Sequence, residues 1–196
     1  MSSLPSGMGW KLPAWTRDLV HPKQRFAGVS ERMEVAVELS RRNVTERTGG
    51  PFGAAVFDMA TGQPLALGVN LVVATSSAAA HAEVVAVCLA GQRVGNYDLS
   101  AGNGGPTELV TSCSPCAMCL GAVPWSGVSR VVIGAREEDA RSVGFDEGNR
   151  PADWVEGLHR RGIEVVQDVL RAEAVAVLRD YVAGGGLVYN SSKTEG

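Results

Sequence analysis

Hydrophobic and polar residues along the first quarter of the chain follow a helical period. Apolar residues at Met33, Val37 and Val44 recur among charged residues at the spacing of one helix face. Ser30 precedes this run as an N-cap candidate, and residues 49–51, Gly-Gly-Pro, follow it as a stop signal. The pattern predicts an amphipathic helix between these two signals.

Farther along the chain, strand patterns alternate with helix patterns. An Ala-rich apolar run at residues 81–90 predicts a mostly buried helix, and residues 130–135 form the clearest strand pattern in the chain. The other expected elements are strands at 52–57, 64–69, 108–111 and 163–166, and helices at 116–123, 154–161 and 170–182. This order predicts a layered α/β sandwich in which the later strands run parallel through helical crossovers.

Length and composition place the chain among ordinary globular proteins. It has 196 residues, of which 45% are hydrophobic and 20% charged, so disordered, collagen-like and coiled-coil classes are poor fits. A chain of this length can bury a core without disulfides. The net charge is −3 and only three residues are lysines, so we expect neither nucleic acid nor an anionic membrane as a partner.

The sequence predicts a protein of the cytoplasm. Residues 1–10 lack a basic segment followed by an apolar run, and the chain has no stretch of 18 consecutive apolar residues. Cys113, Cys116 and Cys119 lie within seven residues, which is typical of metal-binding thiols in a reducing compartment rather than of a spread disulfide framework.

Two fragments carry the chemistry: His81-Ala-Glu83 and Ser114-Pro-Cys116-Ala-Met-Cys119. One imidazole and two thiolates are three ligands suited to tetrahedral zinc, and no fourth protein ligand of matching spacing is obvious, which would leave a position for water. Cys116 follows a proline at a predicted helix start, where backbone N–H groups stabilise a thiolate. Glu83 is then placed to move protons to and from that water, which is a hydrolytic arrangement.

The same residues also fit interpretations without catalysis. A Cys-x-x-Cys pair with a distant histidine can form a structural zinc site, and Cys113 has the spacing of a fourth ligand that would close it. The alternative for Cys113 is a thiol packed at a strand end near the site. Cys88, within the apolar run, is predicted to be a core thiol, and His21 and His159 are predicted to be solvated.

The motif pair His-x-Glu and Pro-Cys-x-x-Cys resembles the signature of the zinc-dependent cytidine deaminase superfamily. Further similarity to the bacterial guanine deaminase branch lies at Gly50-Pro-Phe-Gly53, Asn70, Cys119-Leu-Gly-Ala-Val-Pro-Trp125 and Gly144-Phe-Asp-Glu147. The resemblance implies a three-layer α/β/α sandwich of the cytidine deaminase-like type, with a mixed sheet of about five strands. It divides the chain into an extended N-terminal segment (1–27), a zinc deaminase core (28–150) and a C-terminal helical part with a tail (151–196).

The resemblance also implies a role for each matching residue. Zinc would be bound by His81, Cys116 and Cys119, with Glu83 as the acid/base and Glu147 as a second proton shuttle toward the leaving amine. Substrate contacts would come from Asn70, the backbone of Ala82, Phe52, Trp125 and, as a lid, Tyr189. Family members are homodimers in which the C-terminal part is exchanged between subunits in some cases. Here the chain continues past Tyr189 to Gly196, beyond where the family tail often ends.

The expected function is zinc-dependent hydrolytic deamination of a free nucleobase, with guanine converted to xanthine and ammonia. Aminotriazines such as ammeline present a similar amino-amidine edge. The alternatives are a deaminase acting on a nucleoside or on tRNA adenosine, and a zinc-stabilised module without catalysis. The acidic charge and the scarcity of lysine disfavour the tRNA alternative, since each phosphate contact needs a cation or a donor.

Overall fold

The computed structural model describes residues 9–190 and contains one five-stranded mixed sheet. The strand order is β2-β1-β3-β4-β5; β1 pairs antiparallel with β2 and β3, whereas β3, β4 and β5 are parallel. The strands are β1 (Gly53–Asp58), β2 (Pro64–Val69), β3 (Thr107–Cys113), β4 (Arg130–Ala135) and β5 (Glu164–Val166). The predicted α/β class and the parallel later strands are therefore confirmed.

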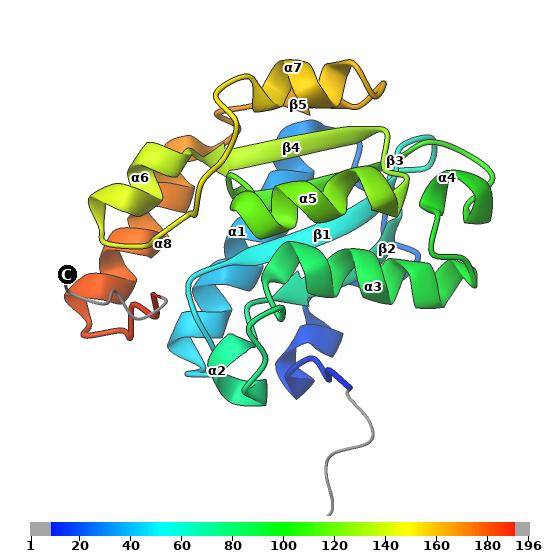
Figure 1. The fold of residues 1–196 in the computed structure, drawn as a ribbon. Helices are drawn as coiled ribbons and strands as arrows, with labels where there is room; N and C mark the ends of the chain where they lie inside the picture. Colours follow the sequence, from blue (N-terminus) through cyan, green and yellow to red (C-terminus); the bar gives the residue numbers. More distant parts are fainter. Residues whose placement is uncertain (1–8, 191–196) are drawn as a thin grey trace, which may run out of the picture.

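Helices cover both faces of this sheet. Figure 1 shows α3 and α5 in front of the sheet and α1 behind it. The α1 and α8 side chains share one apolar core with the sheet, and α3, α5 and α7 contribute to the second. The longer helices are α1 (Val29–Thr45), α3 (Ala82–Val94), α5 (Ala117–Ser126) and α8 (Arg171–Ala183), and the short helix α7 (Trp154–His159) packs beside β5. The fold is a three-layer α/β/α sandwich.

The first helix begins earlier than predicted. Its N-cap is Gly28, not Ser30, which lies inside the first turn. The Glu31 carboxylate accepts a hydrogen bond from the Ala27 N–H at 2.9 Å, and the Arg32 N–H bonds the Gly28 carbonyl, so the first turn closes ahead of Ser30.

Four short elements have no counterpart among the predictions. They contain four to six residues each, which is too short for a hydrophobic period to repeat. These are the 3-10 helix η1 (Ala14–Asp18) and the helices α2 (Val72–Thr75), α4 (Leu99–Gly102) and α6 (Glu137–Ser142).

The N-terminal segment packs on its own domain over the described residues. Phe26 is buried, and Trp10 and Trp15 are partly buried against the core. The Trp15 indole N–H donates to Thr48 Oγ1 at 3.2 Å, and the Arg42 guanidinium lies 4.9 Å from the Trp15 ring centre. The rest of the predicted segment, residues 1–8, lies outside the described part.

Two helix N-termini approach each other on the front face of the sheet. His81 is the N-cap of α3 and Cys116 is the N-cap of α5. A Cβ atom at Gly68 would overlap the Ala82 carbonyl oxygen, so glycine in β2 allows the start of α3 to lie directly on the strand. Only Ser114 and Pro115 separate the end of β3 from Cys116. The fold thereby brings the two sequence motifs together.

The C-terminal helix α8 packs against β4 and α1 of its own chain. The chain then turns at residues 184–186, where the Tyr181 hydroxyl donates to the Leu187 carbonyl at 2.8 Å. This turn directs Tyr189 toward the N-terminus of α3. Across residues 9–190, no helix is long and apolar enough to cross a bilayer.

Candidate active site

Three metal-ligating side chains converge where α3 and α5 begin. One ligand atom from each of His81, Cys116 and Cys119 lies within 4.8 Å of the others. The Cys116 Sγ is 3.5 Å from His81 Nδ1. Zinc bonds of about 2.3 Å to sulfur and 2.0–2.1 Å to nitrogen require ligand atoms at about this separation. The donor set and its spacing therefore fit zinc.

Cys113 lies outside this ligand cluster. It ends β3, is 2% exposed, and directs its Sγ toward the Arg136 carbonyl oxygen at 3.9 Å. Within the described chain, the metal-ligand grouping contains His81, Cys116 and Cys119 and not Cys113. This geometry favours the thiol packed at a strand end over the fourth zinc ligand.

The electrostatics of the cluster favour a thiolate at Cys116. Hydrogen bonds from Cys119 and His81 outweigh burial and lower the pKa of the Cys116 thiol to about 4. The same contact with Cys116, together with burial, raises the pKa of Cys119. Burial alone would lower the pKa of His81, but the Cys116 sulfur and the nearby carboxylates raise it. Cation binding would relieve this accumulation of negative charge.

Two buried carboxyl groups flank the cluster. Glu83, in the first turn of α3, is 8% exposed, and its Oε2 lies 3.5 Å from Cys119 Sγ. Glu147 is 6% exposed, and its backbone carbonyl accepts from the Ala117 N–H at 2.9 Å. Burial, reinforced by the Cys116 charge, raises the pKa of Glu83 to about 7 and that of Glu147 to about 8. Both groups are poised to exchange protons near neutral pH.

A small cavity opens beside the ligand cluster. It is lined by Phe52, Asn70, His81, Glu83, Ser114, Cys116, Phe145, Asp146, Glu147 and Tyr189. Its volume is about 30 Å³. A single water needs about 10–15 Å³ on this measure, so the closed cavity has room for water but not for a planar heterocycle.

Tyr189 closes the cavity. Asn70, which is 1% exposed, donates from Nδ2 to the Tyr189 hydroxyl, and its Oδ1 accepts from the Val72 N–H at 3.3 Å. The Tyr189 ring lies edge-on to His81, with ring centres 6.3 Å apart. Asn190 holds the adjoining tail by accepting from Asp146 N–H and donating to the Gly144 carbonyl, each at 2.9 Å. In this conformation the Tyr189 hydroxyl occupies the amide donor of Asn70.

The structure also places the remaining predicted substrate contacts. Phe52 lines the cavity and meets Phe145 edge-on, with ring centres 4.9 Å apart. Ala82 is the first residue of α3, so its backbone N–H has no acceptor within the helix. Phe145, Asp146 and Ser114 were not predicted as pocket residues, although all three lie within the quoted motifs.

Trp125 lies outside this cavity. It is 80% exposed in the last turn of α5 and lines a surface groove with Tyr97, which is 85% exposed. Cys88, predicted as a core thiol, is exposed in the same groove. Within one chain Trp125 lies away from the cavity, because its side of α5 faces outward, so its contact with the base stays a prediction. The Cys88 prediction is wrong because this part of α3 is uncovered.

Comparison with protein-family models identifies the family to which this site belongs. The model of the cytidine and deoxycytidylate deaminase zinc-binding region matches residues 29–135, more than half of the chain. The chain belongs to this family. Its members share the zinc-binding region, which here contains His81, Glu83, Cys116 and Cys119. The predicted zinc cofactor is therefore confirmed at the level of the family.

Within the deaminase family, guanine deaminases are among the most similar proteins. Guanine deaminase of Bacillus subtilis (strain 168) is 39% identical over 112 residues, 57% of this chain and 67% of the relative. A solved structure of guanine deaminase from Nitrosomonas europaea aligns with a TM-score of 0.87 and 42% identity, covering 93% of this chain and 100% of that one. The tRNA-specific adenosine deaminase of Buchnera aphidicola is 28% identical over 58% of this chain and 69% of its own length.

Proposed function

We propose that this protein is a zinc-dependent aminohydrolase that converts guanine and water to xanthine and ammonia. The observation that carries the proposal is the cluster of three metal-ligating side chains beside one closed cavity that two buried carboxyl groups line. The similarity to guanine deaminases across nearly the whole chain supports guanine as the substrate.

The residues of the cavity divide the proton transfers between them. A zinc ion bound by His81, Cys116 and Cys119 would supply Lewis acidity and lower the pKa of a water to about 7. Glu83 accepts the proton of that water and delivers it to a ring nitrogen beside the attacked carbon. Glu147, with a pKa raised to about 8 by burial, holds a proton that it can give to the departing amine as the C–N bond breaks, and the second hydrogen of the attacking water then replaces that proton on Glu147. Two carboxyl groups with raised pKa values thus serve the two ends of the reaction.

Other side chains would hold the base in place. The Asn70 amide now satisfies the Tyr189 hydroxyl, and the same donor is available to a ring acceptor once Tyr189 moves. Phe52 and Phe145 offer aromatic surface against a planar ring. Tyr189 would return over the bound base and exclude bulk water from the site.

Free bases, triazines such as ammeline, nucleosides and tRNA adenosine share the same chemistry at the reacting carbon. The tail favours the smaller substrates, because Tyr189 lines the cavity and bonds Asn70, while Asn190 attaches the adjoining tail to Gly144 and Asp146. The net charge of −3 also gives no long-range attraction for tRNA.

A substrate panel tests this proposal. Zinc-loaded protein is incubated with guanine, adenine, cytosine, cytidine, ammeline and a tRNA anticodon stem, and released ammonia is measured. We expect the highest kcat/KM for guanine, with xanthine as the stoichiometric product. Faster release of ammonia from the tRNA stem or from cytidine would contradict guanine as the substrate and identify that substrate class instead.

A second prediction concerns Glu147. Glu147→Gln removes the proton donor but keeps the size of the side chain, so we expect kcat for guanine to fall about 10² fold with little change in the substrate Kd. The check combines steady-state kinetics with equilibrium binding of guanine to zinc-free protein. An unchanged kcat would show that Glu147 does not donate the proton and is a structural carboxyl group.

The proposed assembly is a cytoplasmic homodimer. Tyr97 and Trp125 expose large aromatic surfaces on the α3–α5 side, which supports contact with a second copy there. The clustered free thiols support a reducing compartment. Since Tyr189 lines the pocket of its own chain, exchange of the C-terminal part between subunits is not required for a complete site and stays a prediction.

A further inference from the structure

Arg150 is a buried cation that neither the zinc-ligand cluster nor the proton transfers use. Its side chain is only 5% exposed, and its guanidinium lies 4.9 Å from the ring centre of Trp154. Burial of an arginine is unfavourable unless its charge and its donors are paired. Within residues 9–190, both terminal nitrogens of Arg150 have partners, whereas its buried Nε has none. The contacts of the two terminal nitrogens therefore indicate which segments Arg150 holds together.

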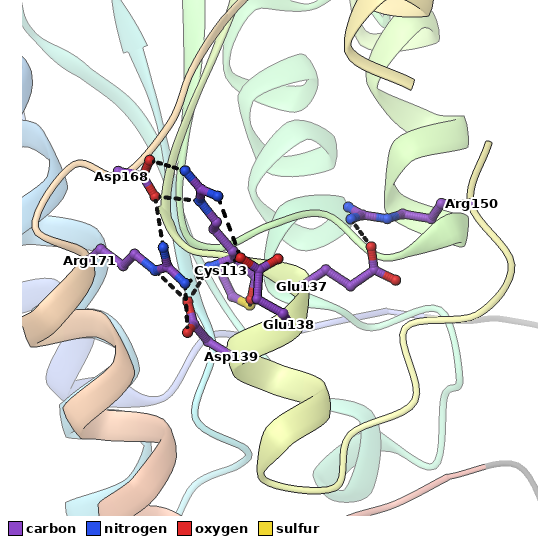
Figure 2. A network of polar contacts seen from close by, with 8 residues as sticks. Cys113, Glu137, Glu138, Asp139, Arg150, Asp168 and Arg171 are labelled. Atoms are coloured by element: carbon purple, nitrogen blue, oxygen red, sulfur yellow. Dashed lines mark hydrogen bonds and ion pairs between the residues drawn. The ribbon is translucent and has the colours of Figure 1, made fainter. Parts of the chain in front are cut away.

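Those contacts join three segments of the site. Arg150 Nη1 donates to Ser114 Oγ at 2.7 Å and to the Pro115 carbonyl at 2.8 Å, and Nη2 pairs with Glu137 at the start of α6. Figure 2 shows Arg150 and Glu137 pointing toward each other, with Cys113 and the acidic start of α6 close by. The two acceptors at Ser114 and Pro115 belong to the turn that leads directly into Cys116.

The arginine also lies three residues after Glu147. The Glu147 carbonyl bonds the Ala117 N–H, so the Glu147 segment is attached to the start of α5 at two points, one through its backbone and one through Arg150. Movement of either segment would change the position of the Glu147 carboxyl group relative to the Cys116 sulfur.

We propose that Arg150 is a positioning residue that fixes the Ser114–Pro115 turn, and with it the Cys116 sulfur and the Ser114 hydroxyl, at the wall of the cavity. Ser114 lines this cavity and is 4% exposed. Because its Oγ accepts from Arg150, the hydroxyl keeps its own hydrogen to donate to an acceptor on the bound base. The catalytic consequence of this inference rests on the proposed function.

The test compares Arg150→Met and Arg150→Lys with the control Arg160→Met, which removes an arginine that is 66% exposed and pairs with Asp153. Cobalt is substituted for zinc, and the absorption of the thiolate–cobalt site is recorded with thermal unfolding, kcat and KM. We expect Arg150→Met to change the cobalt spectrum and to lower kcat about 10–100 fold. Lysine should recover only part of kcat, because its ammonium group cannot make the two parallel hydrogen bonds of a planar guanidinium. Arg160→Met should match the wild type in every measurement.

Ser114→Ala and the double variant Ser114→Ala/Arg150→Met separate positioning from bulk stability. Loss of the donor in Ser114→Ala should raise KM more than it lowers kcat. If Arg150 acts through Ser114, the double variant should raise KM no more than the stronger single variant does. Multiplication of the two effects on KM would contradict this part of the inference.

Wild-type cobalt spectrum and kinetics in Arg150→Met would overturn the proposal, whatever the change in Tm. If Arg150→Met does not fold, Arg150→Lys decides by the same criteria. The cobalt comparison remains decisive even if the wild type releases no ammonia from guanine, which would refute the proposed function alone. In that case a changed spectrum still supports the positioning role and an unchanged spectrum still refutes it.

Discussion

Replacement of Glu83 by glutamine is expected to lower kcat for guanine by about 10³–10⁴ fold while the protein keeps one zinc per chain. Glutamine has nearly the same size and keeps a hydrogen-bonding carbonyl, so the first turn of α3 should persist. It cannot accept and then return a proton, however. The zinc ligands His81, Cys116 and Cys119 are unchanged, so the loss should appear in the chemical step rather than in metal binding.

The measurement combines zinc analysis, steady-state kinetics and equilibrium binding of guanine to Glu83→Gln. Glu173→Gln is the matched control, because Glu173 also lies in the first turn of a helix but is exposed on α8. We expect the control to turn over at the wild-type rate. Full activity of Glu83→Gln with zinc bound would remove Glu83 from the mechanism.

The second large effect is expected at Cys116. Cys116→Ala removes one of three protein ligands and the thiolate favoured by the surrounding hydrogen bonds, so zinc should dissociate and ammonia release should fall below detection. Cys113→Ala removes a thiol only three residues away that bonds a backbone carbonyl instead. We expect this control to keep stoichiometric zinc and most of its turnover, at a modest cost in Tm.

Metal analysis after dialysis against a weak chelator distinguishes the two variants, and circular dichroism verifies their folds. Equal loss of zinc from Cys113→Ala and Cys116→Ala would mean that both thiols bind the metal. Retention of zinc and activity by Cys116→Ala would contradict the ligand set altogether.

The sequence was sufficient for the elements whose pattern repeats. Residues 64–69 and 130–135 are strands with the predicted bounds, because both are short apolar runs bounded by turn residues. The motif residues His81 and Cys116 come together because each begins a helix on the same face of the sheet. Local signals of this kind do not depend on distant contacts, so a single sequence can reveal them.

Other features depend on packing that the pattern does not encode. Trp125 and Cys88 lie in apolar segments, and an apolar helix has the same sequence pattern whether its outer face is covered or exposed. Arg150 has no motif of its own, since its acceptors lie 13, 35 and 36 residues earlier in the chain. The closure of the cavity by Tyr189 likewise depends on a contact with Asn70 across 119 residues.

The zinc K-edge X-ray absorption of the zinc-loaded wild-type protein tests the central claim most directly. The account predicts two sulfur neighbours at about 2.3 Å and two nitrogen or oxygen neighbours at about 2.0–2.1 Å, from the two cysteines, the histidine and one water. Three sulfur neighbours would show that Cys113 fills the position needed by water, and the hydrolytic mechanism would then be contradicted.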